Sequence, residues 1–453
     1  MVPDAVSAGP TERGEKSLDG HNRFTVQSPD MTAKTRTIAD LHETNRQIVF
    51  RTIWIAGVIS RADLARITRI NKTTISAIVA SLIDSGFVIE RESTEKKVGR
   101  QPIELTIAAD RHWFFSLDVR TERTVAAIID MSGLEIAREV IRYSARNPNP
   151  RSLVRRIRTA FDRLTSSAGV KPSRFGAVGV NVPGVVDIRS GVVERCPCLG
   201  WIGVPIADLM RTGLDTTVPI IVEPNAAAAI RAEIWRGRHL DEATTAVYVA
   251  INEEIDTAIV LDGKVLMLAA PRGPGSFGRM VIADQGPSAP NHERESWEDF
   301  ASVNALFKKC GVAITTDKPT DACIAEIREL AGRGDAKILR ALEDEAYWLG
   351  VGIANIAVAL GFGIIVVGGL MTHVWDYLGN TVESVASARV KRYGTRVPEI
   401  LIADIPPDGN DAAVLTSLSG FVSFDLLRRL AGKDKEIIES IVLHHTMKKN
   451  VRD

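Results

Sequence analysis

The sequence predicts an α/β protein in which a small, mainly helical domain precedes a larger body. Its 453 residues are enough for two to three domains of ordinary size. Between about Ile38 and Ile107, apolar residues recur first with a helical period and then in two short strand patterns. From Trp113 onward, strand patterns alternate with helical ones, which is typical of α/β architectures.

The bulk composition excludes several classes of protein. With 45% hydrophobic and 25% charged residues, the chain is close to an average globular protein. Basic and acidic residues balance at 56 each, so binding to nucleic acid would need a local patch of charge. The chain has no long apolar run and no signal-peptide core, so we expect no membrane segment and a cytoplasmic location. Four cysteines, of which only Cys196 and Cys198 are close, predict neither a disulfide framework nor a zinc site.

The two ends of the chain differ from the rest. Residues 1–35 are polar and lack any period, which predicts a disordered tail. Residues 431–453 predict a short charged helical extension with a frayed end. Between them we expect an N-terminal unit over residues 36–110, followed by the α/β body.

One helix of the N-terminal unit is well defined by its sequence. Asn71 is a favourable N-cap, and Gly86 is suited to end the helix. Its apolar stripe consists of Ile75, Ile78, Val79, Leu82 and Ile83. Its opposite face carries Lys72, Thr73, Thr74, Ser76 and Ala77, followed by Ala80 and Ser81. Small and hydroxyl side chains suit a helix that enters a DNA major groove, where Lys, Ser and Thr reach phosphates or base edges.

A second helix precedes this one at helix-turn-helix spacing. Residues 60–63 fit a capping box with Asp63 in place of the usual Glu. Leu64, Ala65 and Ile67 form the predicted inward face. Residues 68–70 make a three-residue connection in which Arg69 stands where glycine is common. An earlier helix from about Ile38 to Gly57 is expected to pack across both, through Ile38, Leu41, Ile48, Ile53 and Ile55.

The rest of the unit predicts a wing. Residues 87–89 and 103–107 read as two strands around a charged tip. Lys96, Lys97 and Arg100 place cations at this tip, and Arg100 beside Gly99 suits a DNA minor groove. We therefore predict a winged helix-turn-helix that binds a double-stranded DNA operator. The alternative is a three-helix module with a hairpin that contacts protein, and failure to select any DNA sequence would favour it.

Several motifs of the body occur together. They are FSLDVR at 115–120, VNVPGVVD at 180–187, LGWIGVPI at 199–206, EPNAA at 223–227, LDGK at 261–264 and IVVGG at 365–369. Through them the body resembles the ROK family, which groups sugar-responsive repressors with sugar kinases. The order of helix-turn-helix, wing and body also resembles that of ROK repressors, and the resemblance covers about residues 38–430.

The resemblance implies an actin-like, ribonuclease-H-like fold with two lobes, expected over residues 111–240 and 241–430. It also implies a repressor of carbohydrate-related genes that binds DNA as a homodimer or homotetramer. A symmetric dimer would need paired half-sites on the DNA.

The residues needed for kinase chemistry are missing from the matching positions. The first phosphate cradle of the family reads Asp-x-Gly-Gly-Thr, whereas residues 118–122 here read DVRTE. In the second cradle, Glu253, Glu254 and Asp256 would repel a triphosphate. The catalytic base of the kinases is an Asp, and Asn225 takes its place. We therefore expect no catalytic residue and no enzyme activity; the alternative is a sugar kinase with an appended N-terminal domain.

The resemblance also places an effector site. Its expected residues are Gly184, Asn225, Ser276, Arg279 and Glu298. The zinc loop of the family matches residues 284–295, which contain no cysteine, so we expect neither a metal nor a cofactor. Two alternatives remain for Arg279. It binds the acidic group of a sugar acid or sugar phosphate, as its planar donor fork allows, or it pairs with Glu298 or another carboxylate in a vestigial cleft that no longer takes a sugar.

Overall fold

The computed structural model describes most of the chain between Ile38 and Pro406. The described ranges are 38–92, 103–143, 148–236, 240, 244–261, 263–266, 276–283, 295–313 and 319–406. The chain divides into two compact units, Met1–His42 and Glu43–Asp453. The predicted tail at 1–35, the wing cations Lys96, Lys97 and Arg100, the segment 284–294 and the extension at 431–453 lie outside the described residues.

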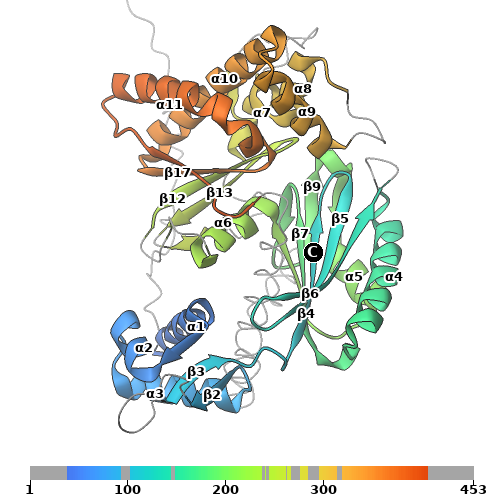
Figure 1. Ribbon diagram of the computed structural model, residues 1–453, viewed down its shortest axis with the longest axis vertical. Helices are drawn as coiled ribbons and strands as arrows, with labels where there is room; N and C mark the ends of the chain where they lie inside the picture. The colour runs from blue at the N-terminus through green and yellow to red at the C-terminus, as the bar shows by residue number, and fades with distance from the viewer. Residues whose placement is uncertain are drawn as a thin grey trace, which may run out of the picture. The chain divides into compact units, whose positions relative to one another are not determined.

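The predicted N-terminal unit, residues 36–110, combines three helices with a small antiparallel sheet (Figure 1). Its helices are α1 (Ile38–Ala56), α2 (Arg61–Thr68) and α3 (Lys72–Asp84). Its strands are β1 (Val58–Ser60), β2 (Val88–Glu92) and β3 (Ile103–Ile107), in the order β1-β3-β2. This is the arrangement of a winged helix, as the sequence predicts.

The core of this unit corrects two details of the sequence analysis. Ile55 is 53% exposed and Ile67 is 55% exposed, so the prediction that both pack inward is wrong. On α1 the buried side runs through Phe50 and Ile53, and Ile55 lies on the opposite side because successive residues are about 100° apart. On α2 the inward side is centred near Leu64, which leaves Ile67 at the solvent margin.

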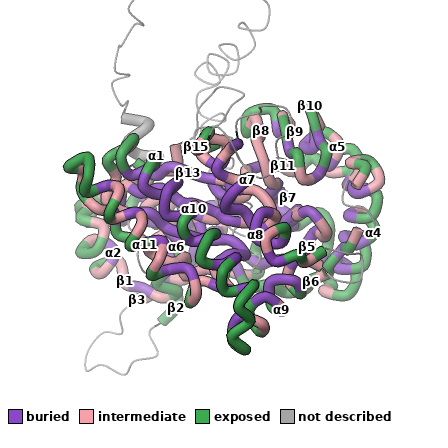
Figure 2. Tube along the Cα trace, turned by 90° about the horizontal axis from the view of Figure 1, so that it is seen from above, coloured by how far each residue is buried: buried purple, intermediate pink, exposed green. Residues whose placement is uncertain are grey.

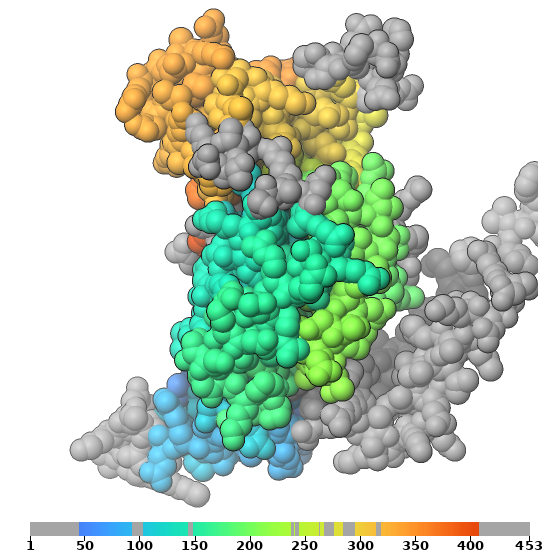
Figure 3. All heavy atoms as spheres, turned by 90° about the vertical axis from the view of Figure 1, so that its right-hand side faces the viewer, coloured from blue at the N-terminus to red at the C-terminus, as the bar shows by residue number. Residues whose placement is uncertain are grey.

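The first lobe of the body is built on a five-stranded sheet in the order β11-β7-β4-β5-β6. Its strands are β4 (Trp113–Val119), β5 (Arg123–Asp130), β6 (Glu135–Arg142), β7 (Phe175–Val182) and β11 (Ile220–Pro224). Helices α4 (Pro150–Ala168) and α5 (Ile206–Leu214) share one apolar core with this sheet and cover the face turned to the viewer in Figure 3. A small sheet of β8 (Val185–Asp187), β9 (Val192–Cys196) and β10 (Trp201–Val204) adjoins them.

The second lobe repeats this pairing pattern. Its sheet has the order β14-β13-β12-β17-β18, with β12 antiparallel to β13 and parallel to β17. Its strands are β12 (Ala246–Ile251), β13 (Ile255–Leu261), β14 (Lys264–Val265), β17 (Ile364–Gly368) and β18 (Glu399–Ile402). Its helices are α6 (Asn225–Arg236), α7 (Trp297–Ala301), α8 (Val303–Cys310), α9 (Thr320–Gly332), α10 (Ala336–Leu360) and α11 (Trp375–Arg392).

Both faces of the second sheet are buried, because alternate residues of a strand point to opposite faces. Along β12, Val247 and Val249 pack in the core that contains α10 and α11, whereas Tyr248 packs in the core that contains α6. Figure 2 shows this as a long buried stretch along α10. The prediction of a two-lobed α/β body is therefore confirmed. Among the residues that the structure covers, none of the helices has an apolar stretch of the length needed to cross a bilayer.

Candidate functional site

The helix-turn-helix is fixed by caps within its own sequence. The Asn71 side chain accepts a hydrogen bond from the Thr74 amide at 2.8 Å, which satisfies one of the free donors at the start of α3. The Ser60 hydroxyl oxygen accepts from the Asp63 amide at 3.1 Å, and the hydroxyl donates to the Asp63 carboxylate at 2.7 Å. Between the helices Arg69 adopts a left-handed conformation with φ of 57°, which explains why glycine is common there.

The predicted DNA-contacting residues of α3 lie on one side of the helix. Lys72, Thr73, Ser76 and Ala77 are exposed, Thr74 is half-buried, and the apolar stripe opposite them is buried. Lys96, Lys97 and Arg100 are not among the described residues. The sequence analysis missed Arg69 as a candidate contact. It is exposed in the turn just before α3, and its signal was a cation at the entrance to the predicted recognition helix.

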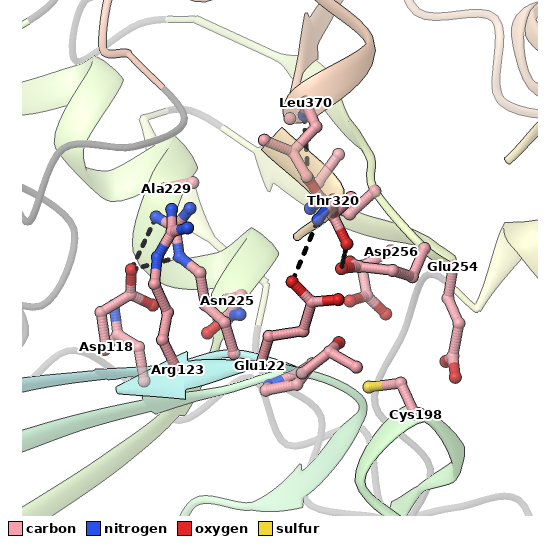
Figure 4. A pocket seen from close by; sticks show the side chains of 18 of the residues that line it. Asp118, Glu122, Arg123, Cys198, Asn225, Ala229, Glu254, Asp256, Thr320 and Leu370 are labelled. Atoms are coloured by element: carbon pink, nitrogen blue, oxygen red, sulfur yellow. Dashed lines mark hydrogen bonds and ion pairs between the residues drawn. The ribbon is translucent and has the colours of Figure 1, made fainter. Parts of the chain in front are cut away.

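Two adjoining pockets lie in the body. The first pocket is lined mainly by polar residues at the ends of β4, β7 and β12 and at the starts of α6 and α9 (Figure 4). The second pocket is lined by Gly184, Ser276, Arg279 and Glu298, together with apolar residues of β8, α6 and β13. Asp256 lines both pockets. Of the five expected effector residues the structure thus brings four together, while Asn225 lines the first pocket instead.

The backbone requires glycine at position 184, independently of any ligand. Its φ is 89°, which side chains rarely adopt. A Cβ atom at this position would also lie 2.4 Å from the carbonyl oxygen of Arg195. The turn between β7 and β8 therefore requires glycine whatever the pocket binds.

The first pocket is rich in carboxylates. The acidic residues that line it are Asp118, Glu122, Glu253, Glu254, Asp256 and Asp321, and the basic ones are Arg120 and Arg123. Arg120 pairs with Asp118 at 2.6 Å, and Arg123 pairs with Asp321 of α9. Protein carboxylates thus partly neutralise both guanidinium groups.

Two backbone amides of pocket-lining residues donate to side chains of the protein itself. Helix α9 has no side-chain cap of its own, because Pro319 holds its N-cap position. Its first amide, that of Thr320, donates to the Glu122 carboxylate at 3.0 Å, and Figure 4 shows the two residues facing each other. The Leu370 amide likewise donates to the Asn252 side chain at 2.9 Å. A helix N-terminus is a ready anion site, and here a carboxylate from the other lobe fills it.

Arg279 lies among carboxylates. Its Nε is 3.7 Å from Glu298 Oε1, and its Nη2 is 3.8 Å from Glu254 Oε2. Both separations are longer than a hydrogen bond, so the two alternatives for Arg279 stay open. Burial raises the pKa of Glu254 to about 7, with further contributions from Asp256 and Glu298, and Arg279 opposes the shift. Burial also raises the pKa of Asp256 and of Glu298.

Comparison with known proteins identifies the family. The model of the ROK family matches residues 115–415. A xylose repressor from Caldicellulosiruptor bescii is 23% identical over 337 residues, which cover 72% of this chain and 83% of that protein. The crystal structure of a ROK family transcriptional regulator, described as a homologue of the Escherichia coli Mlc protein, shares the fold with a TM-score of 0.68 at 18% identity, covering 85% of this chain and 98% of that one.

A kinase has the same body fold. A ROK family glucokinase from Streptomyces griseus, solved with glucose and AMPPNP, matches with a TM-score of 0.51 at 19% identity. It covers 67% of this chain and 97% of its own. Likeness at this level shows the fold alone, so the chemistry has to be argued from the residues of the pockets. Since the family model matches more than half of the sequence, the chain belongs to the ROK family.

Proposed function

We propose that the chain is a ROK-family transcriptional repressor of carbohydrate-related genes, which binds a double-stranded DNA operator through α3 and the wing. The observation that carries this is the outer side of α3. It is exposed and small or hydroxylated, it has Lys72 at its start, and it follows a capped three-residue turn. Such a surface lets a helix backbone come close to a groove. The xylose repressor named above supports the regulatory assignment.

The body, in this proposal, senses an effector and assembles a homodimer or homotetramer in the cytoplasm, without a cofactor. The Glu122 carboxylate at the start of α9 and the paired arginines of the first pocket support the absence of kinase activity. Asn225 in place of a catalytic Asp supports it further, since an amide cannot accept the hydroxyl proton. A homodimer would present two α3 helices to two half-sites about one helical turn of DNA apart.

Selection of bound genomic fragments, followed by fluorescence anisotropy, tests the DNA-binding proposal. Lys72→Ala and Thr73→Ala should each weaken operator binding about tenfold. Lys72→Ala should also reduce the slope of the logarithm of the binding constant against the logarithm of salt concentration by about one, the loss of one phosphate contact. Lys171→Ala, an exposed lysine of the body, is the matched control and should bind normally. No selected fragment, or equal affinity of the α3 variants and the control, would contradict the proposal.

The kinase alternative has a separate test. Purified protein is assayed for ATP turnover with a panel of hexoses, beside the Asn225→Ala variant. We expect no turnover above background in either protein. Turnover that depends on Asn225 would overturn the non-enzymatic assignment.

A further inference from the structure

The first pocket has a surplus of negative charge that the described residues do not neutralise. Its carboxylates outnumber its guanidinium groups three to one. Arg120 pairs with Asp118 and also attracts Glu253, and Arg123 pairs with Asp321. Among the described residues, Glu122 and Glu253 form no ion pair. Glu122 accepts a hydrogen bond from the Thr320 amide, and Glu253 accepts one from the Thr320 hydroxyl.

The border with the second pocket adds to this surplus. There Glu254 and Glu298 both lie near Arg279, and this guanidinium also attracts the carboxylate of Asp256. A single guanidinium group therefore lies near three carboxylates. Desolvation raises the pKa of Glu253, as it does that of Glu254 and Asp256, although Arg120 opposes the shift at Glu253 and Arg279 opposes it at Glu254 and Asp256.

A second, independent observation points to a missing hydrogen-bond donor. Asn181 is only 1% exposed and lines the first pocket, yet its side-chain oxygen has no hydrogen-bond partner within the described part of the chain. The side-chain oxygen of Asn225, across the same pocket, is in the same state. Buried polar atoms are nearly always satisfied, so two unpartnered acceptors that line one pocket indicate a ligand that brings donors.

We propose that the first pocket binds a small hydroxylated organic cation, an amino sugar, whose ammonium group faces Glu122, Glu253 and Asp256 and whose hydroxyls donate to Asn181 and Asn225. The proposal rests on the proposed function, because the ligand would be the effector of the repressor. A sugar acid or sugar phosphate would meet like charge here. A neutral sugar would satisfy the amide oxygens and leave the carboxylates unpaired.

The site would also couple the ligand to the conformation of the body. Glu122 belongs to the turn between β4 and β5 of the first lobe, whereas Glu253 lies between β12 and β13 of the second. Thr320 of α9 donates to both carboxylates, through its amide and its hydroxyl. An ammonium group that attracts both acids would compete for these bonds, and so would favour a different arrangement of the two lobes.

Thermal unfolding of the full chain, at pH 7 and constant ionic strength, tests the proposal. The probes are glucosamine, galactosamine and mannosamine at millimolar concentration. Each is compared with its parent hexose, with its N-acetyl derivative, which keeps the ring and loses the charge, and with the matching hexuronic acid. At least one hexosamine should raise the midpoint by several degrees, and its three neutral or acidic counterparts should raise it far less. Separate runs contain MgCl2 or CaCl2 alone.

Variants locate the site. Glu253→Gln and Asn181→Ala should each weaken the binding of that hexosamine at least tenfold, while Glu343→Gln on the exposed side of α10 should not. Asp256→Asn replaces Glu253→Gln if the latter does not fold. Three results would overturn the proposal: no hexosamine exceeds its parent hexose, the shift survives in the pocket variants, or a divalent ion reproduces it. Since none of these measurements uses DNA, the operator assay can fail or succeed independently.

Discussion

The N-termini of α3 and α9 meet the same physical problem in opposite ways. Both helices begin with amide groups that have no partner inside the helix. In α3 the cap is Asn71, one residue before the helix, and the outer side stays exposed. In α9 the cap position is Pro319, and the acceptor is Glu122, 198 residues away in the chain. One helix start is therefore capped by its neighbouring residue, and the other is capped by a carboxylate from a distant part of the chain.

The largest expected effect is on the exposed helix. Ser76→Glu places a carboxylate on the outer side of α3, where we expect DNA phosphates, and should weaken operator binding about 100-fold, or about 3 kcal/mol. The unfolding midpoint should stay unchanged because Ser76 is exposed. Fluorescence anisotropy checks the first expectation and thermal unfolding the second. Ser173→Glu on the exposed surface of the body is the control, and an equal loss of affinity there would remove α3 from the interface.

The closed helix should respond in stability. Glu122→Ala removes the acceptor of the Thr320 amide, whose residue is 3% exposed, and should lower the free energy of unfolding by about 1–2 kcal/mol. Glu122→Gln keeps an acceptor without its charge and should lose about half as much. Urea denaturation measures both. An unchanged free energy in the alanine variant would mean that water replaces the carboxylate at no cost.

Loss of the local cap of α3 should have a smaller effect. Asn71→Ala should lower the stability by about 1 kcal/mol, and Asn71→Asp should restore most of it. Urea denaturation of the two variants beside the native chain gives the comparison. If the aspartate variant is as unstable as the alanine variant, the cap is not what holds the start of the helix.

The acid cluster of the body predicts a pH dependence. Because the pKa of Glu254 is raised to about 7 in the folded chain, this group favours folding most below its ordinary pKa. Its contribution is lost as the pH rises through about 7. The unfolding midpoint should therefore be higher at about pH 6 than at about pH 8, and Glu254→Gln should reduce the difference. A difference of the same size in that variant would assign the effect to other groups.

The smallest effect concerns the turn before α3. Arg69→Gly should stabilise the chain by about 0.5 kcal/mol, because glycine adopts the left-handed conformation without steric cost but loses more freedom on folding. The same substitution removes the exposed cation that the sequence analysis missed. If Arg69 touches the operator, affinity falls while stability rises, and the two measurements separate the roles.

The sequence predicted best what depends on residues close together in the chain. The Asn71 cap and the exposed side of α3 follow from spacing of three or four residues, and the structure has them. The sequence alone also shows that the phosphate cradles of the family have lost their glycines in this chain. That Glu122 would occupy the start of α9 was not, because no local pattern relates it to Thr320.

Two kinds of detail were beyond local patterns. Ile55 and Ile67 are apolar in type, but which side of a short helix is buried depends on what packs against it. Asn225 was expected with the other effector residues, and the structure assigns it to the adjoining pocket at the start of α6. The placement of each lining residue depends on how strands far apart in sequence come together.

The carboxylate at the start of α9 limits what a single substitution could restore in the first pocket. Restoring the family's threonine at position 122 alone would remove the carboxylate that accepts from the Thr320 amide, and would leave the Leu370 amide bound to Asn252 and five acids in the first pocket. This single reversal would cost stability, because the buried Thr320 amide would lose its acceptor. In a chain that carries Glu122, the contact between the two lobes at the start of α9 therefore opposes the return of an open helix N-terminus.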